Sequence, residues 1–161
     1  MKRENILNWD YYYMSLAHLT GFRSKDPSTQ VGCCIVDYDN KLVSIGYNGL
    51  PHGCDDNCFP WSREGEFLET KYPFVVHAEL NAILNSKNSV KNCKIYVSLF
   101  PCNECAKAII QSGIKEVVYE SDKYADTLGV IASKKMLECA NIKLRKLDKN
   151  LKVNVVIENN N

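Results

Sequence analysis

The stretch KIYVSLFPCNECAKAIIQS, residues 94–112, joins a strand to a helix and decides the type of fold. Residues 94–100 are a short apolar run that predicts a strand, and residues 102–112 have the spacing of a helix. Pro101 suits the first turn of that helix, where its missing N–H costs nothing. Cys102 and Cys105 then lie at the start of the helix and share one face of it. The helix dipole lowers the thiol pKa there, which suits both sulfurs to binding a metal.

The same alternation of strand and helix continues on both sides of this stretch. We expect further helices at residues 6–21, 76–86 and 126–139, and further strands at residues 31–36, 42–47, 116–120 and 142–147. The first two strands should pair as an antiparallel hairpin, whereas strands joined through helices should run parallel. The pattern therefore predicts an α/β fold with a mixed sheet of about five strands, covered on both faces. The last helix is expected to be one-sided, with its apolar face formed by Leu128, Ile131, Ala132, Met136 and Cys139.

Length and composition indicate one domain. A chain of 161 residues that is 45% hydrophobic can bury roughly two thirds of its unfolded surface, which is enough for a self-supporting core. We expect a single domain at residues 1–147 and a polar tail at residues 148–161, with its Asn-rich end disordered. The irregular stretch at residues 48–73 is too long for a simple connection, and such loops usually cover or shape a site.

Net charge and cysteine content limit the kinds of function that we expect for the protein. The net charge is +1 and the Lys and Arg residues are scattered, so a polynucleotide is not an expected partner. No apolar segment approaches the length of a membrane span or a leader, and we expect a cytoplasmic protein without membrane attachment. Its eight cysteines should then stay reduced, which makes Cys-x-x-Cys an indicator of metal binding or catalysis.

His77-Ala78-Glu79 supplies the rest of a hydrolytic metal site. His77, Cys102 and Cys105 are three zinc ligands, and a catalytic zinc keeps its fourth position for water. Glu79 is not needed as a ligand and is free to move protons. Taken singly, each part has a plainer interpretation, because Cys-x-x-Cys is also a redox motif and a lone His in an apolar stretch is often a core residue. The joint pattern favours the metal, although a purely structural zinc module remains an alternative if a fourth protein ligand is present.

The order H-x-E followed by P-C-x-x-C resembles the zinc-dependent nucleobase deaminases. Further stretches, in matching order between Trp9 and Leu147, resemble the deoxycytidylate (dCMP) deaminase family within that superfamily. They are SKDP (24–27), QVG (30–32), GYNGLP (46–51), HAELNA (77–82), LFPCNECA (99–106) and SDKY (121–124).

This resemblance implies a three-layer αβα sandwich and the hydrolysis of dCMP to dUMP and ammonia, which feeds thymidylate synthesis. It implies a zinc ion bound by His77, Cys102 and Cys105 that activates water. Glu79 would carry protons from that water to N3 of the cytosine ring and then to the departing amino group.

Substrate and effector residues are expected in loops near the site. Cations and clustered donors suited to a 5′-phosphate follow the first helix and the strand after the cysteine helix, while Asn48 is expected against the sugar. The substrate-binding candidates are Arg23, Ser24, Lys25, Asn48, Ser121, Lys123 and Tyr124. The resemblance also implies a hexamer that dCTP activates and dTTP inhibits. The candidates for that effector site are Tyr47, Asn48, Gly49 and Gly53.

Two further alternatives remain open. Some phage members hold a second zinc, but the spacing of His52, Cys54 and Cys58 does not match the pattern expected for one. A deaminase of another cytosine or adenine substrate would share the metal site. The tRNA-acting enzymes would need a basic face, and the small cytidine deaminases usually carry Cys at the position of His77.

Overall fold

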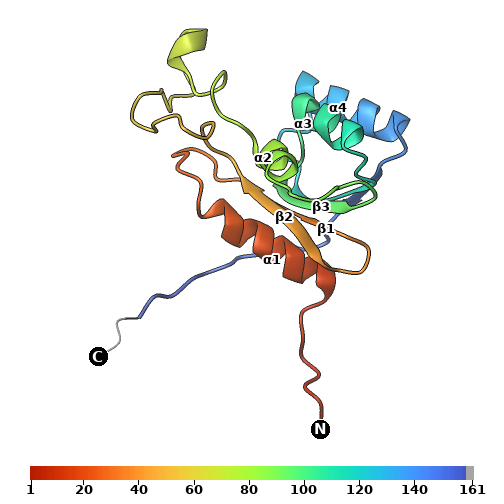
Figure 1. Cartoon of the computed structure of the whole chain (residues 1–161). Helices are drawn as coiled ribbons and strands as arrows, with labels where there is room; N and C mark the ends of the chain where they lie inside the picture. The colour runs from red at the N-terminus through yellow and green to blue at the C-terminus, as the bar shows by residue number, and fades with distance from the viewer. Residues whose placement is uncertain (159–161) are drawn as a thin grey trace.

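The computed structural model describes residues 1–158 and contains one five-stranded mixed sheet (Figure 1). Its order is β2-β1-β3-β4-β5. β1 pairs antiparallel with both β2 and β3, and β3, β4 and β5 run parallel. The predicted mixed sheet and its opening hairpin are confirmed. The strand bounds are β1 Gly32–Val36, β2 Leu42–Tyr47, β3 Lys94–Leu99, β4 Glu116–Ser121 and β5 Lys143–Lys146.

Helices cover both faces of the sheet, which makes the three-layer sandwich that the resemblance implies. On one face, α1 packs through Met14 and Ala17 against Cys34 and Val36. On the other face, α2, α3 and α4 pack over Cys33 and Ile35 and over the alternate residues of β3 and β4. β1 is buried along its whole length, as expected for a strand covered on both sides. The helix bounds are α1 Trp9–Gly21, α2 Ala78–Leu84, α3 Asn103–Gln111 and α4 Leu128–Cys139.

The helices begin later than the sequence pattern suggested. Asn8 caps α1 by accepting a hydrogen bond from the Tyr11 amide, so Ile6 lies before the helix and is exposed. α2 and α3 begin after His77 and Cys102, which are the extended N-cap residues of the two helices. His77 and Cys102 therefore lie just before their helices, whereas Cys105 lies in the first turn of α3.

The predicted apolar face of α4 is wrong for most of its residues, although Met136 packs partly buried against the core. The helix buries Val130, Ser133 and Leu137, whereas Leu128 is 84% exposed and Cys139 is also exposed. The predicted residues and the buried residues both recur at helical spacing. The packing of α4 beside α3 decides which of the two sets faces the core.

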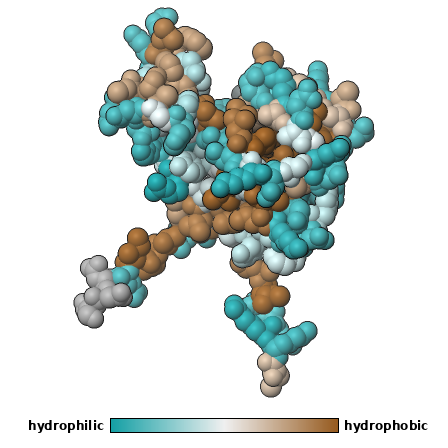
Figure 2. Space-filling view, viewed as in Figure 1, coloured by the Kyte–Doolittle hydropathy of each residue, from teal (hydrophilic) through white to brown (hydrophobic). Residues whose placement is uncertain are grey.

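Long segments outside the regular elements are arranged around this core. Residues 48–77 contain one 3-10 turn, η1 Phe67–Glu69, and a bridge between Gly49 and Val76 brings the two ends of the segment together. Residues 148–158 of the tail contain no helix or strand, although Leu151 packs on the α1 side of the sheet. Val155, Val156 and Ile157 are exposed on the extended tail (Figure 2).

The Asn-rich end of the tail at residues 159–161, for which disorder was expected, lies outside the described residues. Among residues 1–158, no helix combines the length and apolar character needed to cross a bilayer.

Candidate metal centre and active site

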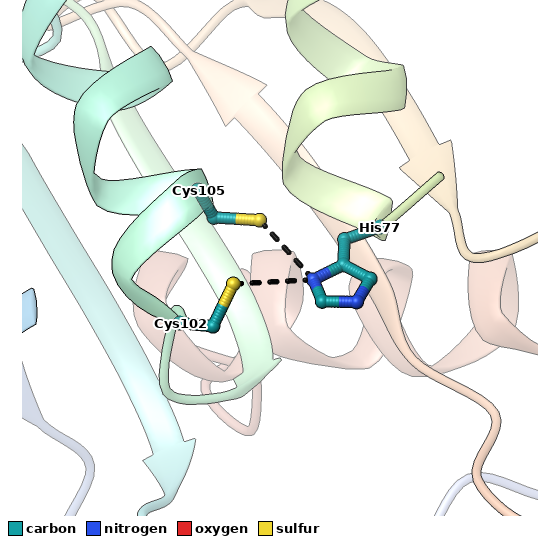
Figure 3. A group of neighbouring side chains, drawn as sticks. All are labelled: His77, Cys102 and Cys105. Atoms are coloured by element: carbon teal, nitrogen blue, oxygen red, sulfur yellow. Dashed lines mark hydrogen bonds between the residues drawn. The ribbon is translucent and has the colours of Figure 1, made fainter. Parts of the chain in front are cut away.

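Two helix starts bring three ligand side chains together at one edge of the sheet (Figure 3). His77 precedes α2, and Cys102 and Cys105 lie at the start of α3 directly after β3. The Nδ1 atom of His77 is 3.3 Å from the Sγ of Cys102 and 3.5 Å from the Sγ of Cys105. In the described part of the chain this is where three or more such ligands converge, with all their ligand atoms within 4.8 Å of one another.

The spacing of these atoms fits zinc. With Zn–S bonds of about 2.3 Å and Zn–N bonds of about 2.0 Å, tetrahedral geometry holds a nitrogen and a sulfur about 3.5 Å apart. The two N···S distances lie close to that value. Cys105 is buried, whereas Cys102 is half-buried and His77 is exposed. Three protein ligands with one open side are typical of a catalytic zinc, since a structural zinc is closed by four.

The pKa values of the three side chains also suit metal binding. Hydrogen bonds from Cys105 and His77 lower the pKa of Cys102 to about 4, so its sulfur is a thiolate at neutral pH. The same contact with Cys102, together with burial, raises the pKa of Cys105. The hydrogen bond to Cys102 raises the pKa of His77 to about 9. A metal cation that displaces the protons of His77 and Cys105 would compensate the negative charge left on the two sulfurs.

Glu79 lies two residues into the same helix start and is only 4% exposed. Burial raises the pKa of its carboxyl, and the nearby His77 opposes that shift. A carboxyl group with a raised pKa can hold a proton nearer neutral pH than an ordinary glutamate. Glu79 is therefore suited to accept and release protons beside the metal centre.

The metal centre opens into a cavity of about 390 Å³. His77, Glu79 and Cys102 line one part of it, and β3 and α4 contribute Leu99, Phe100 and Val130. The loops before β1, after β2 and after β4 complete the walls. The polar and aromatic side chains of these loop walls are Asp26, Thr29, Asn48, Arg63, Lys71, Tyr72, Tyr124 and Thr127. A mainly apolar cavity with a few convergent polar groups is typical of a small-molecule site.

Asn48 joins two of these loops. Its amide oxygen accepts a hydrogen bond from the Val31 N–H at 2.8 Å, and its Nδ2 donates to the Thr29 carbonyl at 3.0 Å. Its Nδ2 also lies 3.3 Å from a carboxylate oxygen of Asp26. The Lys71 ammonium forms a buried ion pair with that oxygen at 2.5 Å. This network holds the cavity wall in one arrangement.

Among the seven substrate-binding candidates, Asn48 and Tyr124 line the cavity. Arg23 is exposed, the Lys25 ammonium pairs with Asp56, and the Ser24 hydroxyl donates to the Asn48 carbonyl at 2.8 Å. Ser121 and Lys123 line a neighbouring shallow hollow, together with Lys146.

The other three effector candidates, Tyr47, Gly49 and Gly53, do not line the cavity. The Tyr47 carbonyl accepts a hydrogen bond from Asn81 at 2.7 Å, Gly49 bridges to Val76, and Gly53 turns the chain with φ +88°. Within residues 1–158, His52, Cys54 and Cys58 are not among the side chains that converge on a potential metal position.

Sequence reasoning missed six polar or aromatic residues of the cavity, which are Asp26, Thr29, Arg63, Lys71, Tyr72 and Thr127. Arg63, Lys71 and Tyr72 lie in the irregular stretch at residues 48–73, which was expected to cover or shape a site. From that stretch Asn48 was chosen as a substrate contact, and these three residues were not. A signal for two of them was present at residues 70–72, because Lys71 and Tyr72 stand close before the histidine motif in the sequence.

The fold and the His–Cys–Cys cluster together define a zinc-binding protein of the αβα class. Residues 7–121 match the family model for the cytidine and deoxycytidylate deaminase zinc-binding region. This chain therefore belongs to the cytidine and deoxycytidylate deaminase family.

Relatives and solved structures agree with this family. The chain is 55% identical to the deoxycytidylate deaminase of Mus musculus over 147 residues, which cover 90% of this chain and 83% of the relative. It is 54% identical to that of Homo sapiens, with the same coverage. The dCMP deaminase of cyanophage S-TIM5, solved in complex with dCMP and dUMP, has a TM-score of 0.69 at 27% identity. That match covers 85% of this chain and 95% of the phage chain.

Proposed function

We propose that this protein is a zinc-dependent hydrolase that converts dCMP to dUMP and ammonia, with residues 1–147 as its deaminase domain. The observation that carries the proposal is the placement of Glu79 beside the His77–Cys102–Cys105 cluster, at a cavity of nucleotide size. Relatives more than 50% identical along most of the chain carry the name of this activity, and the phage neighbour binds dCMP and dUMP.

His77, Cys102 and Cys105 would hold the zinc through one nitrogen and two sulfurs. Zinc bound in this way lowers the pKa of water to about 7 and so supplies a nucleophile at neutral pH. The cavity walls Leu99, Phe100 and Val130 exclude bulk water around the reacting ring. Since the open side of the cluster faces the cavity, the cytosine ring would enter with its C4 toward the metal.

Glu79 would carry the protons. Its carboxylate takes a proton from the attacking water and delivers it to N3 of the cytosine ring. Once the water oxygen is bonded to C4, the carboxylate takes the second proton of that water and passes it to the amino nitrogen. The C4–N bond then breaks and ammonia leaves, so the carboxyl serves first as base and then as acid. Its burial suits it to both roles because burial raises the pKa of the carboxyl, so that it takes up a proton more readily than an exposed glutamate does.

Asn48 and Tyr124 are the expected nucleotide contacts because both line the cavity. Ser24 would act through its hydrogen bond to the Asn48 carbonyl. Arg23, Lys25 and Lys123 lie further out and would contribute positive charge that attracts a nucleotide, and Ser121 would offer a hydroxyl donor.

The proposal is tested by measuring deamination of dCMP, CMP and deoxycytidine by the zinc-loaded protein. We expect the highest kcat/KM for dCMP, and loss of activity when a chelator removes the metal. A protein that releases no ammonia from any of the three would be a structural zinc module. Activity that survives complete removal of metal would contradict the zinc mechanism.

We also infer a cytoplasmic hexamer that dCTP activates and dTTP inhibits, with Tyr47, Asn48, Gly49 and Gly53 at the effector site. Supporting this inference, Asn48 lines the cavity while its neighbours lie outside it, so a ligand bound at these neighbours could act on the cavity wall. We expect a sigmoidal dCMP curve that becomes hyperbolic with dCTP. We also expect a mass in solution six times that of the 18.3 kDa chain.

A further inference from the structure

Arg63 is an exposed cation in the wall of the active-site cavity. It lies on the irregular loop between β2 and α2, whereas Glu79 and Ala78 are buried on α2. Arg63 and Glu79 both line the cavity, which therefore extends from a buried carboxyl beside the metal centre to an exposed guanidinium on the loop. A nucleotide whose C4 lies at the metal centre must therefore direct its 5′-phosphate toward the end of the cavity where Arg63 lies.

The donors of Arg63 are largely available. Its Nε donates to the Tyr72 hydroxyl at 3.2 Å. Within residues 1–158, the ion pairs that involve cavity residues and their neighbours include Lys71 with Asp26 and Lys25 with Asp56, and none includes Arg63. A guanidinium carries five N–H donors, so the bond to Tyr72 orients the side chain and leaves the Nη donors for a ligand.

The loop after β4 adds positive charge near Arg63. Tyr124 lines the cavity from the loop after β4, and the Lys123 ammonium lies 5.1 Å from the centre of its ring. Burial alone would raise the pKa of Tyr124, but Lys123 and Arg63 more than offset this effect and hold the pKa below its usual value. Both cations are therefore close enough to the phenol to act on one site, and a dianionic phosphate is the ligand such a site favours.

We propose that Arg63 selects nucleotides over nucleosides by binding the 5′-phosphate of the substrate through its Nη donors, while Tyr72 holds its Nε in place. This inference rests on the proposed deamination of dCMP. It assigns phosphate selection to a residue of the loop between β2 and α2, with Lys123 and Tyr124 assisting from the facing loop.

The test compares Arg63→Gln with Arg3→Gln, a matched change of an exposed arginine in the N-terminal segment. For each zinc-loaded protein, kcat/KM is measured for dCMP and deoxycytidine, and competitive inhibition is measured for dUMP and deoxyuridine. A lost charge-assisted hydrogen bond corresponds to about a 10- to 100-fold change. Arg63→Gln should lose that factor for dCMP and dUMP and keep the wild-type values for deoxycytidine and deoxyuridine. Arg3→Gln should resemble the wild type throughout.

Two further variants separate phosphate binding from support of the loop. Arg63→Lys keeps the charge without the planar fork and should lie between the wild type and Arg63→Gln. Tyr72→Phe removes the hydrogen bond to Arg63 but keeps the guanidinium. It should lower kcat/KM for dCMP less than Arg63→Gln does. Equal losses for dCMP and deoxycytidine in Arg63→Gln, or unchanged dCMP kinetics, would overturn the assignment. A wild-type protein that does not deaminate dCMP would instead refute the proposed function.

Discussion

Glu79 is the residue on which the proposed chemistry most depends. It is buried and lies two positions after a ligand of the metal centre, without being part of the converging cluster. Its role is therefore separable from metal binding. A glutamine at this position keeps the shape of the side chain and removes its ability to exchange protons.

We expect Glu79→Gln to bind zinc as the wild type does and to lose activity by about 10²- to 10⁴-fold or more, which is the usual contribution of a general acid–base group. The measurement is zinc content by metal analysis alongside dCMP turnover. Glu104→Gln is the matched control, because Glu104 lies between the two cysteines yet its side chain is 68% exposed and paired with Lys107. Near-wild-type turnover in zinc-loaded Glu79→Gln would rule out the proton-carrying role.

At the scale of elements, two glycines set how closely helices approach the hairpin. A Cβ added at Gly46 would lie 2.2 Å from the Ala78 carbonyl oxygen, where α2 crosses β2. A Cβ added at Gly32 would lie 2.0 Å from the Ala17 carbonyl oxygen, where α1 crosses β1 on the other face. The two contacts are equally tight, but only α2 carries Glu79 and follows His77.

The similar contacts of the two glycines allow a comparison of matched variants. Gly32→Ala and Gly46→Ala should each lower the free energy of unfolding by about 1–3 kcal/mol because the helix must move outward. Gly46→Ala should in addition weaken zinc binding and lower kcat, since the displacement moves His77 and Glu79 away from the cysteines. Urea unfolding and zinc titration measure the two effects. Equal zinc affinity in the two variants would show that α2 does not position the centre through this contact.

At the scale of the whole molecule, one ion pair links the first helix to the last strand. The guanidinium of Arg145 in β5 donates to the Asp10 carboxylate of α1 at 2.9 Å, and the buried Tyr96 hydroxyl donates to the same carboxylate at 2.8 Å. The hydrogen bond from Arg145 holds the pKa of Asp10 below its usual value, despite partial burial. The folded state therefore binds the Asp10 proton more weakly than the unfolded chain does.

A lowered pKa in the folded state stabilises the protein above the unfolded value of about 3.9, and this contribution disappears as the pH falls through the folded value. We expect the stability difference between the wild type and Asp10→Asn to be constant above about pH 5 and to shrink below it. Urea unfolding of both proteins from pH 6 to pH 3 measures it. Zinc release in acid affects both proteins alike, so a difference that does not change with pH would contradict this account.

Much of the fold was predictable because its signals are local. Apolar runs and turn residues place β1 and β2, and the strand, proline and helix around Pro101 place β3 and α3 to within a residue or two. The face of α4 was not predictable, since Ile131 and Val130 are both apolar and local spacing satisfies either stripe. Asp26 and Arg63 were missed because no short motif links residues from separate loops that meet only across a cavity.

The sequence by itself determined the element order and the presence of three zinc ligands with a nearby carboxyl, because these depend on side-chain chemistry and on spacings of a few residues. The tertiary structure alone decided how these parts meet. It placed His77 and Cys102 at N-caps a few ångströms apart, buried Glu79, paired Lys71 with Asp26 and turned Arg63 toward the cavity. These outcomes depend on how close α2 and α3 lie on the sheet, which is a property of packing between distant segments that no local pattern records.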